Sequence, residues 1–204
     1  MRNLSRYLIV ALCLLAASCL VISVHPLYKS EDLFANDLLL GQWVDQDTSI
    51  WQFEYGYTGE PIPENTDSTA YLLRFLEKGK SEFSSSEFKV HLINLRGIYF
   101  LDFYIQEYGE DSGNGQELFD LHLFPVHSFA RLDLNEDGAT IRWFNPDWLK
   151  GLAESGQLEL NYELEDGTYL LTAPTEQLQQ FVVKYANDEA AFDDGFTSVL
   201  KRQD

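Results

Sequence analysis

Apolar and polar residues alternate in several short stretches of the chain, and this two-residue period is that of a β-strand with one buried face. In residues 51–55, Trp, Phe and Tyr alternate with Gln and Glu, which predicts a half-buried strand. Further strands are predicted at 71–76, 87–95 and 98–105, and the last two flank Arg96-Gly97, a two-residue hairpin turn. We therefore expect antiparallel β-structure in the middle of the chain.

The same pattern continues on both sides of this region. Additional strands are predicted at 38–44, 121–134, 140–144, 158–164 and 169–171. Asp166-Gly167 is the strongest hairpin signal in the chain. About eight to ten short strands with regularly spaced turns predict a mainly β fold, either an antiparallel barrel or a sandwich.

Two helices are predicted in the C-terminal third. Asn145 is a favourable N-cap, Pro146 suits the first helical position, and Gly156 would end this helix. A final helix begins after Pro174, and its buried stripe follows the helical period at Leu178, Phe181, Val182 and Tyr185. The acidic tail from Asp188 is expected to fray.

The first residues have the layout of a secretory leader. Arg2 and Arg6 form a basic region, and an apolar stretch, 7–15, leads to Ala16-Ala17-Ser18-Cys19. This small-residue run before a cysteine resembles the lipobox of bacterial lipoproteins, in which the leader is removed before the cysteine and its sulfur receives lipid. Two alternatives remain: an uncleaved signal anchor, since residues 7–24 are mostly apolar, and an ordinary cleaved leader.

The cysteines favour the lipoprotein interpretation. The chain has only Cys13, which would leave with the leader, and Cys19, which would become the first residue of the mature protein. We expect a lipoprotein signal peptide over 1–18, a lipidated tether over 19–37 and a β domain with C-terminal helices over 38–204. By the family rule, Leu20 after the lipidated cysteine favours the outer membrane facing the periplasm. A signal-anchored membrane protein is the alternative.

Charge excludes one class of partner. The formal net charge is -19, and loss of Arg2 and Arg6 with the leader would make it -21. Phosphate backbones require clustered Lys and Arg, so nucleic acid is not an expected partner. The excess charge instead suits solubility of an exported domain.

Gly41-Gln42-Trp43 lies on the first predicted strand and resembles the G-x-W signature that opens lipocalin-like barrels. The resemblance implies a barrel with one end plugged by the Trp, an interior able to hold an apolar ligand, and a helix after the last strands. A T-D-Y turn and the late Arg that packs on this Trp are not recognisable. More broadly, the leader-Cys, His25-Pro26-Leu27-Tyr28 and the predicted helix starts look like a group of uncharacterised bacterial lipoproteins.

Aromatic residues at strand period are candidates to line a cavity in such a barrel. The candidate ligand-binding residues are Trp43, Trp51, Phe53, Tyr71, Phe88, Phe100 and Phe103. The alternative is that these side chains simply fill a solid core, as they do in many small barrels.

Other chemistry finds little support. Residues 133–138 fit the first half of a calcium loop, but Phe144 stands where the bidentate Glu is required. His91, His122 and His127 lack metal-ligand spacing and are expected to be structural. Nucleophile and phosphate-binding motifs are missing, so we expect no enzyme activity, no metal and no cofactor.

The sequence therefore predicts a membrane-anchored lipoprotein with a non-catalytic β domain that binds a small apolar ligand or an envelope partner protein. The alternative is a structural or assembly lipoprotein with a solid core. A hydrolase with an unrecognised carboxylate pair is a third hypothesis.

Overall fold

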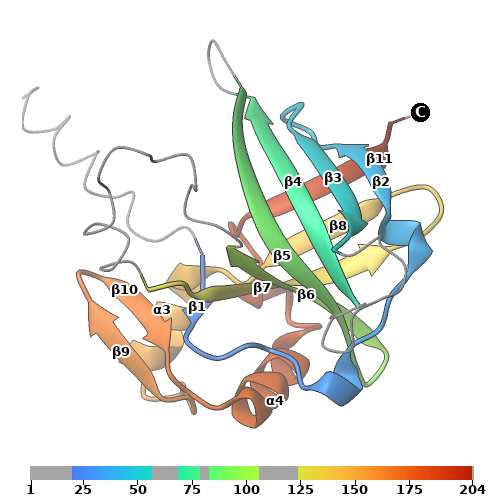
Figure 1. Ribbon diagram of the computed structural model, residues 1–204. Helices are drawn as coiled ribbons and strands as arrows, with labels where there is room; N and C mark the ends of the chain where they lie inside the picture. Colours follow the sequence, from blue (N-terminus) through green and yellow to red (C-terminus); the bar gives the residue numbers. More distant parts are fainter. Residues whose placement is uncertain (1–19, 57–68, 79–82, 106–123, 204) are drawn as a thin grey trace, which may run out of the picture.

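The computed structural model describes residues 20–56, 69–78, 83–105 and 124–203, and its central feature is a closed antiparallel β-barrel (Figure 1). Eight strands form the barrel in the order β6-β5-β4-β3-β2-β11-β8-β7, and pairing of β6 with β7 closes it. Their bounds are β2 Gly41–Val44, β3 Ile50–Tyr55, β4 Ala70–Lys78, β5 Phe83–Leu95, β6 Ile98–Ile105, β7 His127–Leu134, β8 Ala139–Trp143 and β11 Thr197–Arg202. The expected lipocalin-like barrel is thus confirmed.

Three further strands extend the sheet from one side of β7. β1 (Ile22–Ser23) pairs with the start of β7 and, in parallel, with β10 (Thr168–Leu171). β10 forms a hairpin with β9 (Tyr162–Glu165). Two α-helices, α3 (Pro146–Glu154) and α4 (Thr175–Tyr185), and three 3₁₀ turns, η1 (Ser30–Asp32), η2 (Asp37–Leu39) and η3 (Glu189–Ala191), complete the described residues.

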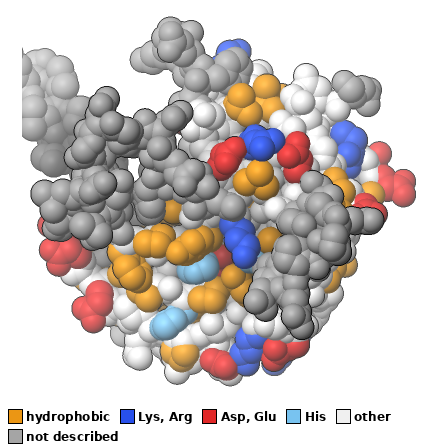
Figure 2. Space-filling model, in the orientation of Figure 1, with side chains coloured by type: hydrophobic (Ala, Val, Ile, Leu, Met, Phe, Trp, Pro, Cys, Tyr) orange, Lys and Arg blue, Asp and Glu red, His pale blue; other side chains and the backbone are white. Residues whose placement is uncertain are grey.

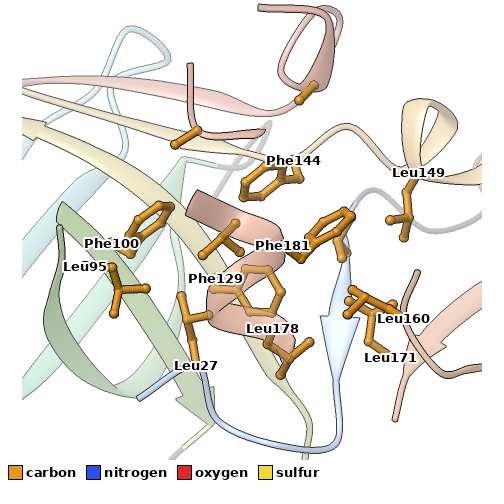
Figure 3. Close-up of a cluster of buried hydrophobic side chains, with 14 of the residues drawn as sticks. Leu27, Leu95, Phe100, Phe129, Phe144, Leu149, Leu160, Leu171, Leu178 and Phe181 are labelled. Atoms are coloured by element: carbon orange, nitrogen blue, oxygen red, sulfur yellow. The ribbon is translucent and has the colours of Figure 1, made fainter. Parts of the chain in front are cut away.

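Apolar side chains form two separate cores. The inner core fills the barrel and consists of Leu39, Trp43, Trp51, Phe53, Tyr71, Leu73, Val90, Leu92, Leu101, Phe103, Ala130, Leu132, Ala139, Ile141, Trp143 and Leu200. The outer core lies between the barrel wall, the helices and the N-terminal segment (Figure 3), and consists of Val21, Leu27, Ile93, Leu95, Phe100, Phe129, Phe144, Leu149, Leu160, Leu171, Ala173, Leu178, Phe181, Val182, Ala186, Ala191 and Phe192. Strands between the two cores are buried on both faces.

The N-terminal segment is part of the domain, so the expectation of a tether over 19–37 is wrong for the described residues 20–37. Val21 and Leu27 are 2% and 0% exposed, and both belong to the outer core. The backbone N–H of Leu27 also donates to the Asp102 carboxylate on β6, over 2.8 Å. Apolar burial on both sides of Pro26 fixes this segment against the barrel.

The tail beyond Asp188 does not fray. Residues 197–202 form β11, which pairs with β8 on one side and β2 on the other, so the last strand completes the barrel. Its alternation is short: Ser198 and Leu200 are the two buried residues of the strand. Two buried positions in a six-residue strand were too weak a signal to predict it.

Local signals were more reliable. The hairpin turns at Arg96-Gly97 and Asp166-Gly167 both form, with positive φ at all four residues. The Asn145 side chain caps α3 by accepting from the backbone N–H groups of Asp147 and Trp148. Neither helix of the described residues has the length and apolar character that spanning a bilayer requires.

We predict that β11 contributes strongly to stability through its inward face. Leu200→Ala should lower the free energy of unfolding by about 2–5 kcal/mol, because this inner-core side chain is 1% exposed. Val199→Ala, on the outward face and 46% exposed, is the matched control and should change it by less than about 0.5 kcal/mol. Urea unfolding measures both, and equal effects would contradict the described register.

Candidate functional site

One end of the barrel is closed around the Gly-x-Trp residues. Gly41 has φ 106°, a backbone conformation that favours glycine, and a Cβ there would lie 3.2 Å from the Nη1 of Arg202. The indole Nε1–H of Trp43 donates to the carbonyl of Leu39 over 2.9 Å. The G-x-W signature is thus explained by one tight corner of the barrel.

Arg202 covers the Trp43 ring from the last strand. Its Cζ lies 4.3 Å from the ring centroid, and the guanidinium donates to the carbonyls of Leu38 and Leu40 over 2.7 and 2.9 Å. The expectation that no late Arg packs on this Trp is therefore wrong. It failed because β11 was not predicted, so nothing indicated that Arg202 returns to β2.

Two tyrosines fix the segment over the closed end. The Tyr71 hydroxyl accepts from the backbone N–H of Asn36 over 2.6 Å and donates to its carbonyl over 3.1 Å. The Tyr55 hydroxyl donates to the Asp37 carboxylate, and this hydrogen bond raises the pKa of Tyr55 to about 12. Burial raises the pKa of Tyr71 as well. Both side chains act as neutral donors that close this end.

The seven aromatic residues predicted to line a cavity do not all lie together. Five belong to the inner core, namely Trp43, Trp51, Phe53, Tyr71 and Phe103. Phe88 is partly buried and packs against the inner core. Phe100 is fully buried in the outer core, on the opposite face of β6 from Phe103 (Figure 3). Its inclusion in one cavity is therefore wrong.

At the other end of the barrel, six aromatic side chains form what we name the aromatic layer: Trp51, Phe75, Phe88, Phe103, Trp143 and Phe196. Trp143 lies at its centre, with ring centroids 5.0 Å from Phe196, 5.3 Å from Phe103 and 6.3 Å from Trp51. Phe88 lies 6.5 Å from Phe103, and Phe196 is 45% exposed. The layer thus extends from the inner core to the surface.

Two polar atoms within this region have no hydrogen-bond partner among the described residues. They are the indole Nε1 of Trp143 and the Oγ of Ser198, and their residues are 4% and 0% exposed. Ser198 is aligned with Ile141, so it lies diagonally across from Trp143 on the inward face. By contrast, the indole of Trp51 donates to Asp45 over 3.0 Å.

This pair is the feature that sequence reasoning missed. Trp143 lies in a predicted strand, but no pattern indicated which indole would lack an acceptor. Ser198 lies in the strand that was not predicted. Each buried group without a partner costs about 1–3 kcal/mol, so the pair calls for a physical explanation. A bound molecule carrying an acceptor, or ordered water, would supply it.

Of the histidines, His127 is buried beside Asp102. Its Nδ1 lies 2.7 Å from the Asp102 carboxylate, and its ring packs between those of Tyr104 and Tyr28, at 4.6 and 6.4 Å. His91 is buried against the Tyr28 ring, with 4.2 Å between centroids. His122 lies outside the described residues.

The structure also gives no support to a calcium site at residues 133–138. Residues 135–138 form the turn between β7 and β8, where the Asn135 side chain accepts from the N–H groups of Asp137 and Gly138. Among the described residues, no group of three His, Cys, Asp or Glu is placed to hold a metal ion. Cys19, the predicted lipidation site, lies outside the described residues.

Comparisons with known proteins yield no relative: no family model matches the chain, and no curated protein or solved structure is significantly similar to it.

We predict that Arg202 stabilises the closed end. Arg202→Met keeps a long apolar stem but removes the cation over Trp43 and two donors, so the free energy of unfolding should fall by about 1 kcal/mol. Lys201→Met, an exposed neighbour on the same strand, is the matched control. If urea unfolding gives the same result for both, the contact with Trp43 contributes nothing.

Proposed function

We propose that this protein is a membrane-anchored lipoprotein whose barrel binds a small apolar molecule that carries a hydrogen-bond acceptor. The observation that carries the proposal is the buried Trp143 indole and Ser198 hydroxyl, which lack partners among the described residues. They face the aromatic layer, which offers flat apolar surfaces to a ligand. Binding in this interpretation involves no catalysis.

The preference for an apolar ligand follows from the surroundings of the two groups. Trp43, Trp51 and Trp143 are all nearly buried, so a charged ligand group would be desolvated beside them. An uncharged acceptor, such as a ketone, ester or ether oxygen, costs far less to bury. It would accept from the Trp143 N–H while Ser198 donates or accepts as required.

A solid-core assembly lipoprotein is the second candidate, and one observation favours it. Aromatic rings inside the barrel already contact one another, as Trp51 does with Phe75 at 4.7 Å and Phe53 at 6.5 Å. Small barrels are often filled in this way. In this alternative, water satisfies Trp143 and Ser198, and the protein works through its acidic surface.

Anchoring at Cys19 would hold the domain directly against the bilayer. Ile22, which begins β1, is three residues after Cys19, so the connection would reach at most about 10 Å. Leu20 and Tyr169 line one hollow beside the start of α3, and Leu164, aligned with Tyr169, is 53% exposed. Hydrophobic side chains gather over the region of β1, β7 and β10 (Figure 2). An apolar ligand would therefore need only a short path from the membrane.

We predict that a naphthalene ketone probe, 6-propionyl-2-dimethylaminonaphthalene, binds the purified full-length protein at one saturable site with a blue-shifted emission. Trp143→Phe should weaken binding about tenfold, because it removes a hydrogen bond worth about 1.4 kcal/mol. Ser198→Ala should weaken binding while leaving stability unchanged or higher, because an unpaired hydroxyl is removed.

Trp148→Phe is the control, because the same change is made beside the outer core. The fluorescence titration uses detergent alone as its blank. Failure of the probe to bind, or equal binding by wild type and Trp143→Phe, would reject the ligand and leave the solid-core candidate.

We predict that intact mass spectrometry of the mature protein finds an N-terminal acylated cysteine. Cys19→Ala should abolish the acyl mass and leave the leader attached, because acylation and cleavage both require the thiol. Two results would contradict the lipid anchor: an unmodified amino terminus on the wild type, or a mass difference between wild type and Cys19→Ala no greater than that of the substitution. Neither result would test ligand binding in the barrel.

A further inference from the structure

A second hollow, unrelated to the barrel interior, lies along α4. It has a volume of about 670 Å³ and runs between α4, η1 and the turn that joins β5 to β6. Figure 2 shows basic and acidic side chains adjoining at the lower edge, where Figure 1 places η1 and α4. We name it the α4 groove.

The lining of the α4 groove carries more cations than acids in a strongly acidic protein. Its lining includes three cations, Lys29, Arg96 and Lys184, and two acids, Asp32 and Glu176, whereas the whole chain carries -19. Long-range repulsion from such a protein disfavours anions, so an anion can bind only where cations gather. The lining of the α4 groove meets that condition.

Arg96 is the cation most clearly free to act. Lys29 pairs with Glu176 over 2.9 Å, and Lys184 lies 3.4 Å from Glu159. In the part of the chain that the structure describes, no hydrogen bond or ion pair engages the Arg96 side chain. Its guanidinium keeps five donors for a carboxylate or a phosphate, which it can bind with two parallel hydrogen bonds.

Arginine is an unfavourable residue for the backbone conformation at position 96. Arg96 has φ 56° and Gly97 has φ 86°, so both central residues of the two-residue turn are in the left-handed region. Asn or Gly is strongly favoured at the first of these positions, and arginine is not. The turn therefore holds a residue that its geometry disfavours, at the position that projects a guanidinium to the groove.

The remaining residues of the groove suit a ligand that carries hydroxyl groups on a small apolar frame. Val183 supplies apolar surface, while Leu95 is only 7% exposed. Asn94, Gln179 and Gln180 supply side-chain amides, and the Asn94 Oδ1 already accepts from the backbone N–H of Gly97 over 2.8 Å, which leaves its Nδ2 to donate. Gln179 is held in place, because its Nε2 donates to the Leu27 carbonyl over 2.9 Å and to Asp32 over 2.7 Å. Amides both donate and accept, which is what sugar hydroxyls require.

We propose that the α4 groove binds a small polyhydroxylated anion, a sugar acid or a sugar phosphate, with its anionic group on the Arg96 guanidinium. The amide of Gln180, the Asn94 Nδ2 and the Gln179 Oε1 take the hydroxyls, and Val183 contacts the apolar face of the sugar ring. This site is independent of the ligand proposed for the barrel, because its lining residues belong to neither the aromatic layer nor the closed end.

Isothermal titration calorimetry of the full-length protein tests this with four probes: glucuronate, glucose 6-phosphate, glucose and inorganic phosphate. One or both sugar anions should bind with one-to-one stoichiometry, and each should bind at least tenfold tighter than glucose or free phosphate. The sugar anion that binds more tightly identifies the anionic group.

Arg96→Asn is the decisive variant, because asparagine suits the turn while removing the guanidinium. Its melting temperature should equal or exceed that of the wild type, and its affinity for the sugar anion should fall at least tenfold. Arg96→Lys should retain part of the affinity. Lys150→Gln, which removes one exposed charge on α3 outside the groove, should bind like the wild type.

Three results would overturn the proposal. The first is that neither sugar anion binds at millimolar concentration. The second is that free phosphate binds as tightly as the sugar anion with the higher affinity. The third is that Arg96→Asn leaves the affinity for that sugar anion unchanged. Failure here would leave the barrel ligand untouched, because the two sites share no residue.

Discussion

The buried carboxylate of Asp102 links the two halves of this protein. It is 0% exposed on β6, and it accepts from the Leu27 backbone N–H and contacts His127 Nδ1 on β7. A buried carboxylate without such partners would be strongly destabilising. The N-terminal segment must therefore lie against the barrel, where it completes the outer core.

This constraint would set how the proposed lipid anchor holds the domain. A chain fixed from Val21 onward leaves almost no linker after Cys19, so a lipid attached there would hold the domain directly at the bilayer. The same segment continues through η1 and η2 to the closed end, where Tyr71 hydrogen-bonds to Asn36. One stretch of chain thus joins the proposed membrane contact to the barrel.

The two proposed sites lie in different parts of the fold and differ in chemistry. The aromatic layer extends from the inner core to the exposed Phe196 and combines apolar rings with the unpaired Trp143 and Ser198 atoms. The α4 groove lies outside the barrel and combines Arg96 with amides and a short apolar floor. The acidic surface elsewhere repels anions. Burial therefore favours the apolar ligand in the barrel, and the cations of the α4 groove favour the anionic one.

Local patterns in the sequence determined most of the strands, both hairpin turns, the Asn145 cap and the mainly β class, because each depends on residues close in the chain. The period alone also separates Phe100 from Phe103, which are three apart on β6 and so face opposite sides. Only the tertiary structure decided the partners of distant groups: β11 between β8 and β2, Arg202 on Trp43, and the unpaired indole of Trp143. Such contacts arise when the barrel closes, and closure brings together residues whose separation along the chain carries no local signal.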